Sequence, residues 1–264
     1  MRIKTIILCG TLAIVSVAAA AQDMMQNVDL ASREMTSAEM SRADVEAAIA
    51  AATSARPVDF TGRRLSGLDL SGLDLSAAVL RSAKLNKTKL ADAKLDHAVL
   101  DQAWLLEADL SRASLKGASM FAAQMRRARL DGADLSGARV AADLTGASLV
   151  GAVLIGANLG ADMKNQSMGL MRAVLRSSNL DRAVLRDADL SRVDLEFASL
   201  KNADLTNASL RGAELGGAAL IGVTIVGTDF RAADLASARL IEPIGLEAAR
   251  NFDQARNLNR LQRE

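Results

Sequence analysis

Residues 67–80 read GLDLSGLDLSAAVL, and the spacing of their leucines decides the fold. Leu70, Leu75 and Leu80 lie five residues apart, and a bulky apolar residue, usually Leu, recurs at this interval across residues 60–240. Ala often stands two positions before it. A fixed period sustained over such a length is typical of a repeat architecture, in which one structural unit stacks on the next.

A period of five matches neither regular element. A helix turns by about 100° per residue, so every fifth side chain drifts around the helix axis. The side chains of a strand alternate between two faces, so every fifth one changes face. The chain must therefore bend by roughly 90° in each unit, which closes a four-sided coil in about 20 residues and keeps each Leu directed at one axis. Stacked coils would hydrogen-bond at the strand spacing of about 4.8 Å, each contacting only its neighbours.

The composition is consistent with such an interior. Large Leu and small Ala fill the coil without aromatic residues, and the chain has no Tyr, one Trp and five Phe. Gly, Ser, Asp and Asn occupy the bends, where turn geometry favours them. Proline is absent between Pro57 and Pro243, as hydrogen bonding between coils requires.

Three segments carry a family resemblance: residues 67–80, GADLSGARV at 132–140 and NADLTNASLRGAEL at 202–215. They resemble the pentapeptide-repeat proteins, whose consensus is A-(D/N)-L-x-x, and the resemblance covers residues 58–240. It implies an all-β solenoid, a right-handed quadrilateral β-helix of pentapeptide repeats. It implies little about activity, because members of such a family share a scaffold more than a function.

A column of alternating charges favours the same coil length. Its members lie 20 residues apart: Asp69, Lys89, Asp109 and Arg129. In a four-sided coil they would stack on one outer face, with each charge beside its opposite. Such neighbours across strands contribute about 0.2–1 kcal/mol each, and less when exposed.

Residues 1–21 are typical of a secretory signal peptide. Arg2 and Lys4 provide the positive start, residues 6–17 the apolar core and residues 19–21 a small-residue cleavage site. The alternative is a retained membrane anchor. The only cysteine lies in this segment, so the processed chain could form no disulfide. We expect a bacterial protein that is periplasmic or secreted after the signal is removed.

Residues 22–57 are interpreted as a polar leader followed by an N-terminal capping helix. The helix is predicted within residues 36–53, where a capping box could form between Thr36 and Glu39 or between Ser41 and Asp44. Such a helix would cover the open first coil, because exposed coil ends invite edge-to-edge association.

Residues 241–264 depart from the repeat and are interpreted as a C-terminal cap. Their apolar residues could seat a short helix over the last coil: Ile241, Ile244, Leu246, Phe252 and Leu258. The predicted organisation is therefore one solenoid domain, residues 58–240, with short helical caps at both ends.

The five-residue period is interrupted near the middle of the chain. After Val140 the next Leu comes four residues later, at Leu144, and the original phase has returned by Leu170. The segment between holds three methionines: Met163, Met168 and Met171. It is either a bulge or short surface loop, or a contact loop, since Met adapts well to binding surfaces.

The sequence offers little for catalysis. Only one histidine is present, His97, at an outward corner position, so a His-based metal site is not expected. The many aspartates before the central Leu recur because the repeat needs a polar outward residue there, and such surface carboxylates have no reason for raised pKa values. No phosphate-binding glycine loop is present. We predict no enzyme, no catalytic or metal residues, no cofactor and no small-molecule substrate.

The resemblance also implies a second hypothesis, because some family members bind DNA topoisomerase by imitating the duplex. B-DNA carries one charge per about 1.7 Å, so a rod of nine coils would need on the order of 25 net negative charges. Residues 58–240 contain 23 Lys plus Arg and 21 Asp plus Glu. A DNA-mimic inhibitor of a topoisomerase or another DNA-binding enzyme therefore stays the alternative, and it requires one acidic face.

Binding to nucleic acid is not expected either. Lys84, Lys89 and Lys94 form a basic run, but the period puts them on three successive sides of one coil. They would ring the coil and not line one face, which favours a solvated girdle over a nucleic-acid site.

An apolar group is the best candidate for a contact site. Val99, Trp104, Leu106 and Phe121 stand where polar residues are usual, and would gather on two adjoining faces if all pointed outward. Such patches often mark contact sites, and Trp is favoured at interface centres. The alternative is that the scaffold tolerates scattered apolar residues.

The sequence therefore predicts an exported, non-enzymatic scaffold for protein–protein contacts. Its partner is an unidentified protein, and membrane association is expected only if residues 1–21 are retained. The oligomeric state stays open.

Overall fold

The computed structural model describes residues 28–161 and 171–263. The predicted signal peptide and two methionines of the interrupted segment, Met163 and Met168, lie outside the described residues. None of the helices among the described residues has the length and apolar character needed to cross a bilayer.

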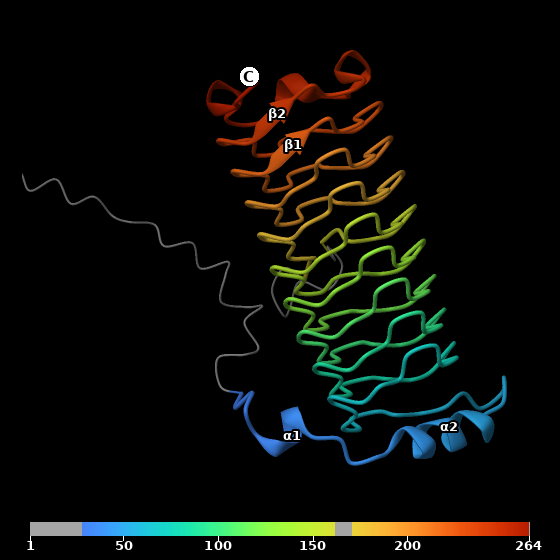
Figure 1. Ribbon diagram of the computed structural model, residues 1–264. Helices are drawn as coiled ribbons and strands as arrows, with labels where there is room; N and C mark the ends of the chain where they lie inside the picture. Colours follow the sequence, from blue (N-terminus) through green and yellow to red (C-terminus); the bar gives the residue numbers. More distant parts are fainter. Residues whose placement is uncertain (1–27, 162–170, 264) are drawn as a thin grey trace, which may run out of the picture.

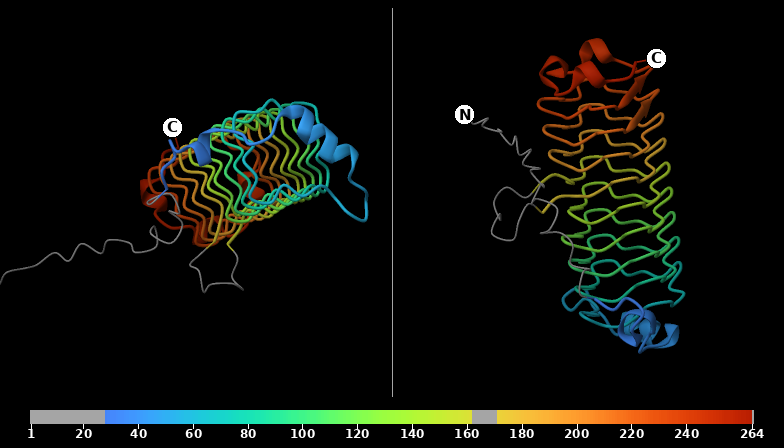
Figure 2. Two further views of the ribbon diagram at one scale, coloured as in Figure 1. Left: turned by 90° about the horizontal axis from the view of Figure 1, so that it is seen from below. Right: turned by 90° about the vertical axis from the view of Figure 1, so that its left-hand side faces the viewer.

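The described chain winds into a stack of coils that forms a rod (Figure 1, Figure 2). Four parallel bridges join one coil to the next, at residues 20 apart over most of the rod: Arg64 to Lys84, Asp69 to Lys89, Asp74 to Lys94 and Val79 to Val99. One pair of coils is regular enough to form two strands, β1 (Ala219–Ile221) and β2 (Arg239–Ile241), which pair in parallel. The predicted coil length is confirmed.

The core is a single column of apolar side chains inside the coils. Leu at every fifth position is buried, as is Ala two positions before it; Leu100 and Ala98 are one such pair. Between them Val99 points outward and forms the bridge to the next coil. The core continues without a gap from Val45 in the N-terminal segment to Leu240.

Each corner is a tight turn with one residue in the left-handed region. At the corner after Leu95, the N–H of Ala98 donates to the carbonyl oxygen of Leu95 (3.0 Å), and His97 has φ 57°. A positive φ at the third residue is the requirement of a type II turn. One coil later Gly117 meets it without steric cost.

Two helices precede the first coil, α1 (Arg33–Thr36) and α2 (Arg42–Ala50), at the blue end of the rod in Figure 1. The capping box between Ser41 and Asp44 is present, which confirms one of the two alternatives. Val45 is fully buried and belongs to the core cluster. Since α2 has nine residues, it is shorter than the predicted helical span.

The C-terminal segment differs from the expected single helix. It forms one further coil whose bridging residues lie six apart: Ile244, Arg250, Arg256 and Gln262. The sixth residue of each side makes room for a short 3-10 turn. These turns are η3 (Leu246–Ala248), η4 (Phe252–Gln254) and η5 (Leu258–Arg260). Gly245, Asn251 and Asn257 precede them with positive φ, which Gly and Asn tolerate best.

The interrupted period has two separate causes. Gln124 pairs with Asp143, 19 residues later, because the corner after Val140 lacks its left-handed residue. Asp143 then pairs with Val174, 31 residues later. Together the two changes return the repeat to its first phase. Most of the extra residues lie outside the described part of the chain, so the choice between a bulge and a contact loop stays open.

Candidate functional site

One edge of the rod differs from the others, and we call it the irregular edge. It is the line of corners that directly follow Leu100, Met120, Val140, Leu159, Leu190, Leu210 and Phe230. Both departures from the five-residue period fall on it. The edge therefore carries most of what distinguishes this chain from a plain repeat.

Three of the four predicted contact residues surround this edge. Val99 and Trp104 occupy the two outward columns that flank it, and Phe121 lies on the corner one coil further on. Leu106 lies at the next corner, beyond the column of Trp104. All four side chains are partly exposed, so whether they form a contact site stays a prediction.

Neighbouring side chains hold this group in place. The guanidinium of Arg139 lies 4.6 Å from the ring centre of Phe121, a cation–π contact that contributes about 0.5–1 kcal/mol at exposed sites. The N–H of Phe121 donates to Oδ1 of Asp101 (3.0 Å). Trp104 lies between Lys84 and Gln124, both nearly covered. The aromatic side chains are therefore set in a packed surface.

The most exposed large apolar side chains lie elsewhere: Leu30, Ile155, Phe197, Val226 and Ile244. Phe197 is the extreme at 63% exposure, on a corner of a different edge, with its ring lying over Gly217. An aromatic residue at a corner position was the sequence signal for it. It gives a natural comparison for the predicted group.

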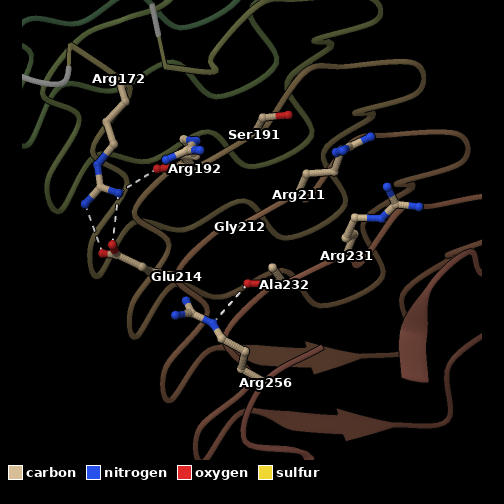
Figure 3. A pocket seen from close by; sticks show the side chains of 9 residues that line it. All are labelled: Arg172, Ser191, Arg192, Arg211, Gly212, Glu214, Arg231, Ala232 and Arg256. Atoms are coloured by element: carbon tan, nitrogen blue, oxygen red, sulfur yellow. Dashed lines mark hydrogen bonds and ion pairs between the residues drawn. The ribbon is translucent and has the colours of Figure 1, made fainter. Parts of the chain in front are cut away.

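A second feature of the irregular edge is a hollow of about 480 Å³ toward the C-terminal end (Figure 3). Its floor consists of three small residues, Ser191, Gly212 and Ala232. Arginines surround this floor: Arg172, Arg192, Arg211, Arg231 and Arg256. Glu214 is the only carboxylate among the lining residues.

Two of these arginines are held firmly by the rod. Arg172 donates to both carboxylate oxygens of Glu214 (3.0 and 2.9 Å) and to the carbonyl oxygen of Arg192 (2.6 Å). Arg256 donates from Nε to the carbonyl oxygen of Ala232 (3.1 Å). These contacts fix one wall of the hollow.

The other three arginines are less engaged. Arg211 lies 3.7 Å from Asp229, a long ion pair, and Arg231 donates to the side chain of Asn251 (3.3 Å). Among the described residues, Arg192 has no carboxylate partner. The sequence analysis missed this hollow. Its signal was two pairs of arginines at the coil interval, 172 with 192 and 211 with 231.

The basic run is arranged as predicted. Lys84, Lys89 and Lys94 belong to three different outward columns. Each lies near a carboxylate: Glu34 (3.4 Å), Asp69 (3.6 Å) and Asp74 (3.8 Å), respectively. The predicted charge column is confirmed as well, with Lys89 beside Asp69 and Arg129 beside Asp109 (3.0 Å).

One outward column has an acidic stretch, but its charges are matched. Its carboxylates are Asp143, Asp194, Glu214 and Asp234. Each has an arginine partner, in the same order Arg126 (2.5 Å), Arg176 (2.9 Å), Arg172 (2.9 Å) and Arg256 (3.8 Å). The column therefore differs from the unmatched negative charge of a DNA backbone.

The regularly spaced aspartates have lowered pKa values. At Asp74, hydrogen bonds from Ser76 stabilise the carboxylate and hold its pKa below the usual value. His97 lies on an outward corner as predicted, with its ring against Gly117. Within residues 28–161 and 171–263, no group of three His, Cys, Asp or Glu side chains could hold a metal ion.

Comparison with known families gives a match over more than half of the chain. The model for pentapeptide repeats (8 copies) matches residues 59–96, 93–137, 123–160, 170–207 and 198–236. A search of the curated proteins found no match.

Solved structures of similar proteins were found as well. One is HetL from the cyanobacterium Nostoc, a pentapeptide repeat protein involved in heterocyst differentiation regulation. It is 30% identical, covers 78% of this chain and 92% of its own, and has a TM-score of 0.38. Another is QnrB1, a plasmid-mediated fluoroquinolone resistance protein. It is 18% identical, covers 69% of this chain and 85% of its own, and has a TM-score of 0.42.

Proposed function

The chain belongs to the pentapeptide-repeat family, and from that premise we propose that it is an exported, non-enzymatic scaffold that binds a protein partner. In this proposal the coils form the right-handed quadrilateral β-helix of the family, and the terminal segments cover its two ends. The burial of Val45 against the first coils supports the N-terminal cover. The packing of Leu246 and Phe252 against the core supports the C-terminal one.

The observation that carries the proposal is the group of Val99, Trp104 and Phe121 around the irregular edge. Elsewhere the outward columns carry mostly polar and charged residues. Trp is enriched at energetically dominant interface positions, and the group is ordered by its neighbours before any partner arrives. A partner that covers it would therefore order few additional side chains, which lowers the entropic cost of association.

Export is the second part of the proposal and rests on residues 1–21 alone. Cell fractionation followed by N-terminal sequencing tests it. We expect a periplasmic or secreted protein that begins at Gln22. A full-length cytoplasmic protein would contradict this part.

The binding role is tested by capture from a periplasmic extract. The bait is the processed protein, compared with a Trp104→Ala, Phe121→Ala variant. We expect the wild type to retain a specific protein and the variant to retain much less. Phe197→Ala is the matched control, because it removes a more exposed aromatic ring from a different edge. Equal retention by wild type and the double variant would remove this surface from the proposal.

The DNA-mimic hypothesis is less well supported. The charges of residues 58–240 nearly balance, and the acidic stretch of one column has arginine partners. We therefore expect no inhibition when the purified protein is added to a topoisomerase supercoiling assay. Inhibition at stoichiometric concentration would favour the mimic over the scaffold.

A further inference from the structure

Most coils place opposite charges next to each other. Arg112 contacts both carboxylate oxygens of Asp92 on the preceding coil (2.8 and 2.7 Å). Lys87 lies 3.7 Å from Glu107 on the following coil. Such pairing is expected, because like charges directly opposite each other across strands are destabilising.

The irregular edge breaks this rule. Four successive coils carry an arginine at its corners: Arg172, Arg192, Arg211 and Arg231. On the other three corner edges of the described coils, no three successive coils carry the same charge. Coils lie about 4.8 Å apart, so these cations are held closer together than exposed charges prefer.

The local carboxylates leave part of this charge unmatched. Glu214 is occupied by Arg172, and Asp229 is shared at long range by Arg211. Arg192 and Arg231 have no ion pair within the described part of the chain. The hollow is therefore positively charged on the side away from Glu214.

Its floor supplies a hydrogen-bond donor as well. At many corners an Asp two residues earlier accepts the backbone N–H that Arg211 carries, but Ser209 stands there instead. The hydroxyl of Ser209 is bonded to that of Ser191 (2.8 Å). Among the described residues, the N–H of Arg211 has no acceptor. Gly212 leaves the backbone accessible because it has no side chain.

We propose that this hollow binds an acidic peptide segment of the protein partner, with carboxylates seated on Arg192, Arg211 and Arg231. The inference rests on the proposed function, since it names the chemistry of the same partner. Arginine suits the task because its planar guanidinium binds a carboxylate through two parallel hydrogen bonds.

The lining favours a peptide over a nucleic acid. Sites for single-stranded nucleic acid combine a basic groove with aromatic side chains on which bases stack, and the lining residues include no aromatic ring. Glu214 would also repel a phosphate backbone, whereas a peptide N–H could donate to it. The hollow is open along the rod, as an extended chain requires.

The test is fluorescence anisotropy with labelled hexaglutamate and the full chain. The variant Arg192→Gln, Arg231→Gln removes two unmatched charges from the hollow. Its control is Arg127→Gln, Arg182→Gln, which removes two corner arginines that likewise have no ion pair within the described chain and lie on other edges. We expect the first variant to bind at least about tenfold more weakly than wild type, and the control to bind like wild type.

Three results would overturn the proposal. They are no binding of hexaglutamate, equal weakening by both double variants, and tighter binding of a thymidine hexanucleotide that depends on the same arginines. The Trp104→Ala, Phe121→Ala variant should bind hexaglutamate normally. Failure of the capture experiment is therefore distinguishable from failure of the arginine site.

Discussion

At the scale of single residues, the structure explains why Asp precedes the central Leu so often. Four of the five backbone N–H groups in a repeat donate to backbone carbonyls, as in residues 132–135. The fifth, on the residue after Leu, does not. At Ser136 it donates to Oδ1 of Asp134 (3.0 Å), and the Ser136 hydroxyl donates to the same atom (2.6 Å). The aspartate completes the hydrogen bonding of the corner.

A second solution to the same problem appears where no Asp precedes the Leu. The N–H of Val150 then donates to Oδ1 of Asp131, which lies on the corner of the preceding coil. Asp96 and Asp181 do the same for Lys116 and Lys201 (3.0 Å each). The sequence indicated that these positions are polar and outward. It did not indicate which N–H each carboxylate accepts.

Replacing Asp134 tests this role. We expect Asp134→Ala to lower the free energy of unfolding by about 1 kcal/mol, because the Ser136 N–H loses its acceptor. Asp134→Asn retains an acceptor oxygen and should cost clearly less. Urea denaturation at neutral pH measures both. An Asn variant as damaged as the Ala variant would mean that charge, and not the corner hydrogen bond, explains the aspartate.

The same carboxylates predict how stability depends on pH. Hydrogen bonds from Ser71 and Ser76 lower the pKa values of Asp69 and Asp74 in the folded chain, below the usual value of 3.8. Their ionised forms therefore stabilise the fold above about pH 4, and this contribution is lost as the pH falls through the folded pKa values. We expect unfolding free energies that are nearly constant between about pH 5 and pH 7 and decline below about pH 4. Stability that rises on acidification would contradict this.

At the scale of elements, the corner is the unit that matters. Gly137 has φ 65° and open space where a Cβ would be, so Gly137→Ala changes only the backbone preference. We expect a loss of about 1 kcal/mol, because an L-residue is disfavoured in the left-handed region. Ala77 has φ 57° at an equivalent corner. Ala77→Gly should therefore be close to neutral, since relief of the strain offsets the flexibility gained by the unfolded chain.

Thermal and urea denaturation of these two variants measure the difference. If Gly137→Ala and Ala77→Gly cost the same, the left-handed residue would not be what limits the corner.

How much of these elements could be predicted depended on the period. The regular sides followed directly from Leu at every fifth position, and the capping box at Ser41 was one of two readable alternatives. The last coil was not predicted, because its sides lengthen to six residues and its apolar positions then resemble a short helix. Its signals were Asn251 and Asn257, which adopt positive φ at the new corners.

The candidate sites were predicted unevenly for a related reason. Spacing was enough to group Val99, Trp104 and Phe121, because the coil length relates their columns. It could not reveal how far their neighbours cover them. The arginine hollow was missed because its members occupy two different corner positions, and the 31-residue step before Val174 hides their alignment in the sequence.

At the scale of the whole molecule, one geometric fact supports everything else. Residues 20 apart lie side by side over most of the rod, and this register makes the leucines converge on one axis. It also aligns the columns that carry the apolar group and the arginines. Each coil contacts only its neighbours, so the register must hold at every step for the rod to form.

Cysteine cross-linking measures that register most directly. With Cys9→Ser as background, Val79→Cys and Val99→Cys place two thiols on bridged residues of adjacent coils. Strand spacing of about 4.8 Å is within the range of disulfide bonds. The control is Val79→Cys with Lys89→Cys, which a four-sided coil puts on opposite sides. We predict that mild oxidation forms an intramolecular disulfide in the first pair only. No disulfide in the first pair, or equal formation in both, would contradict the coil.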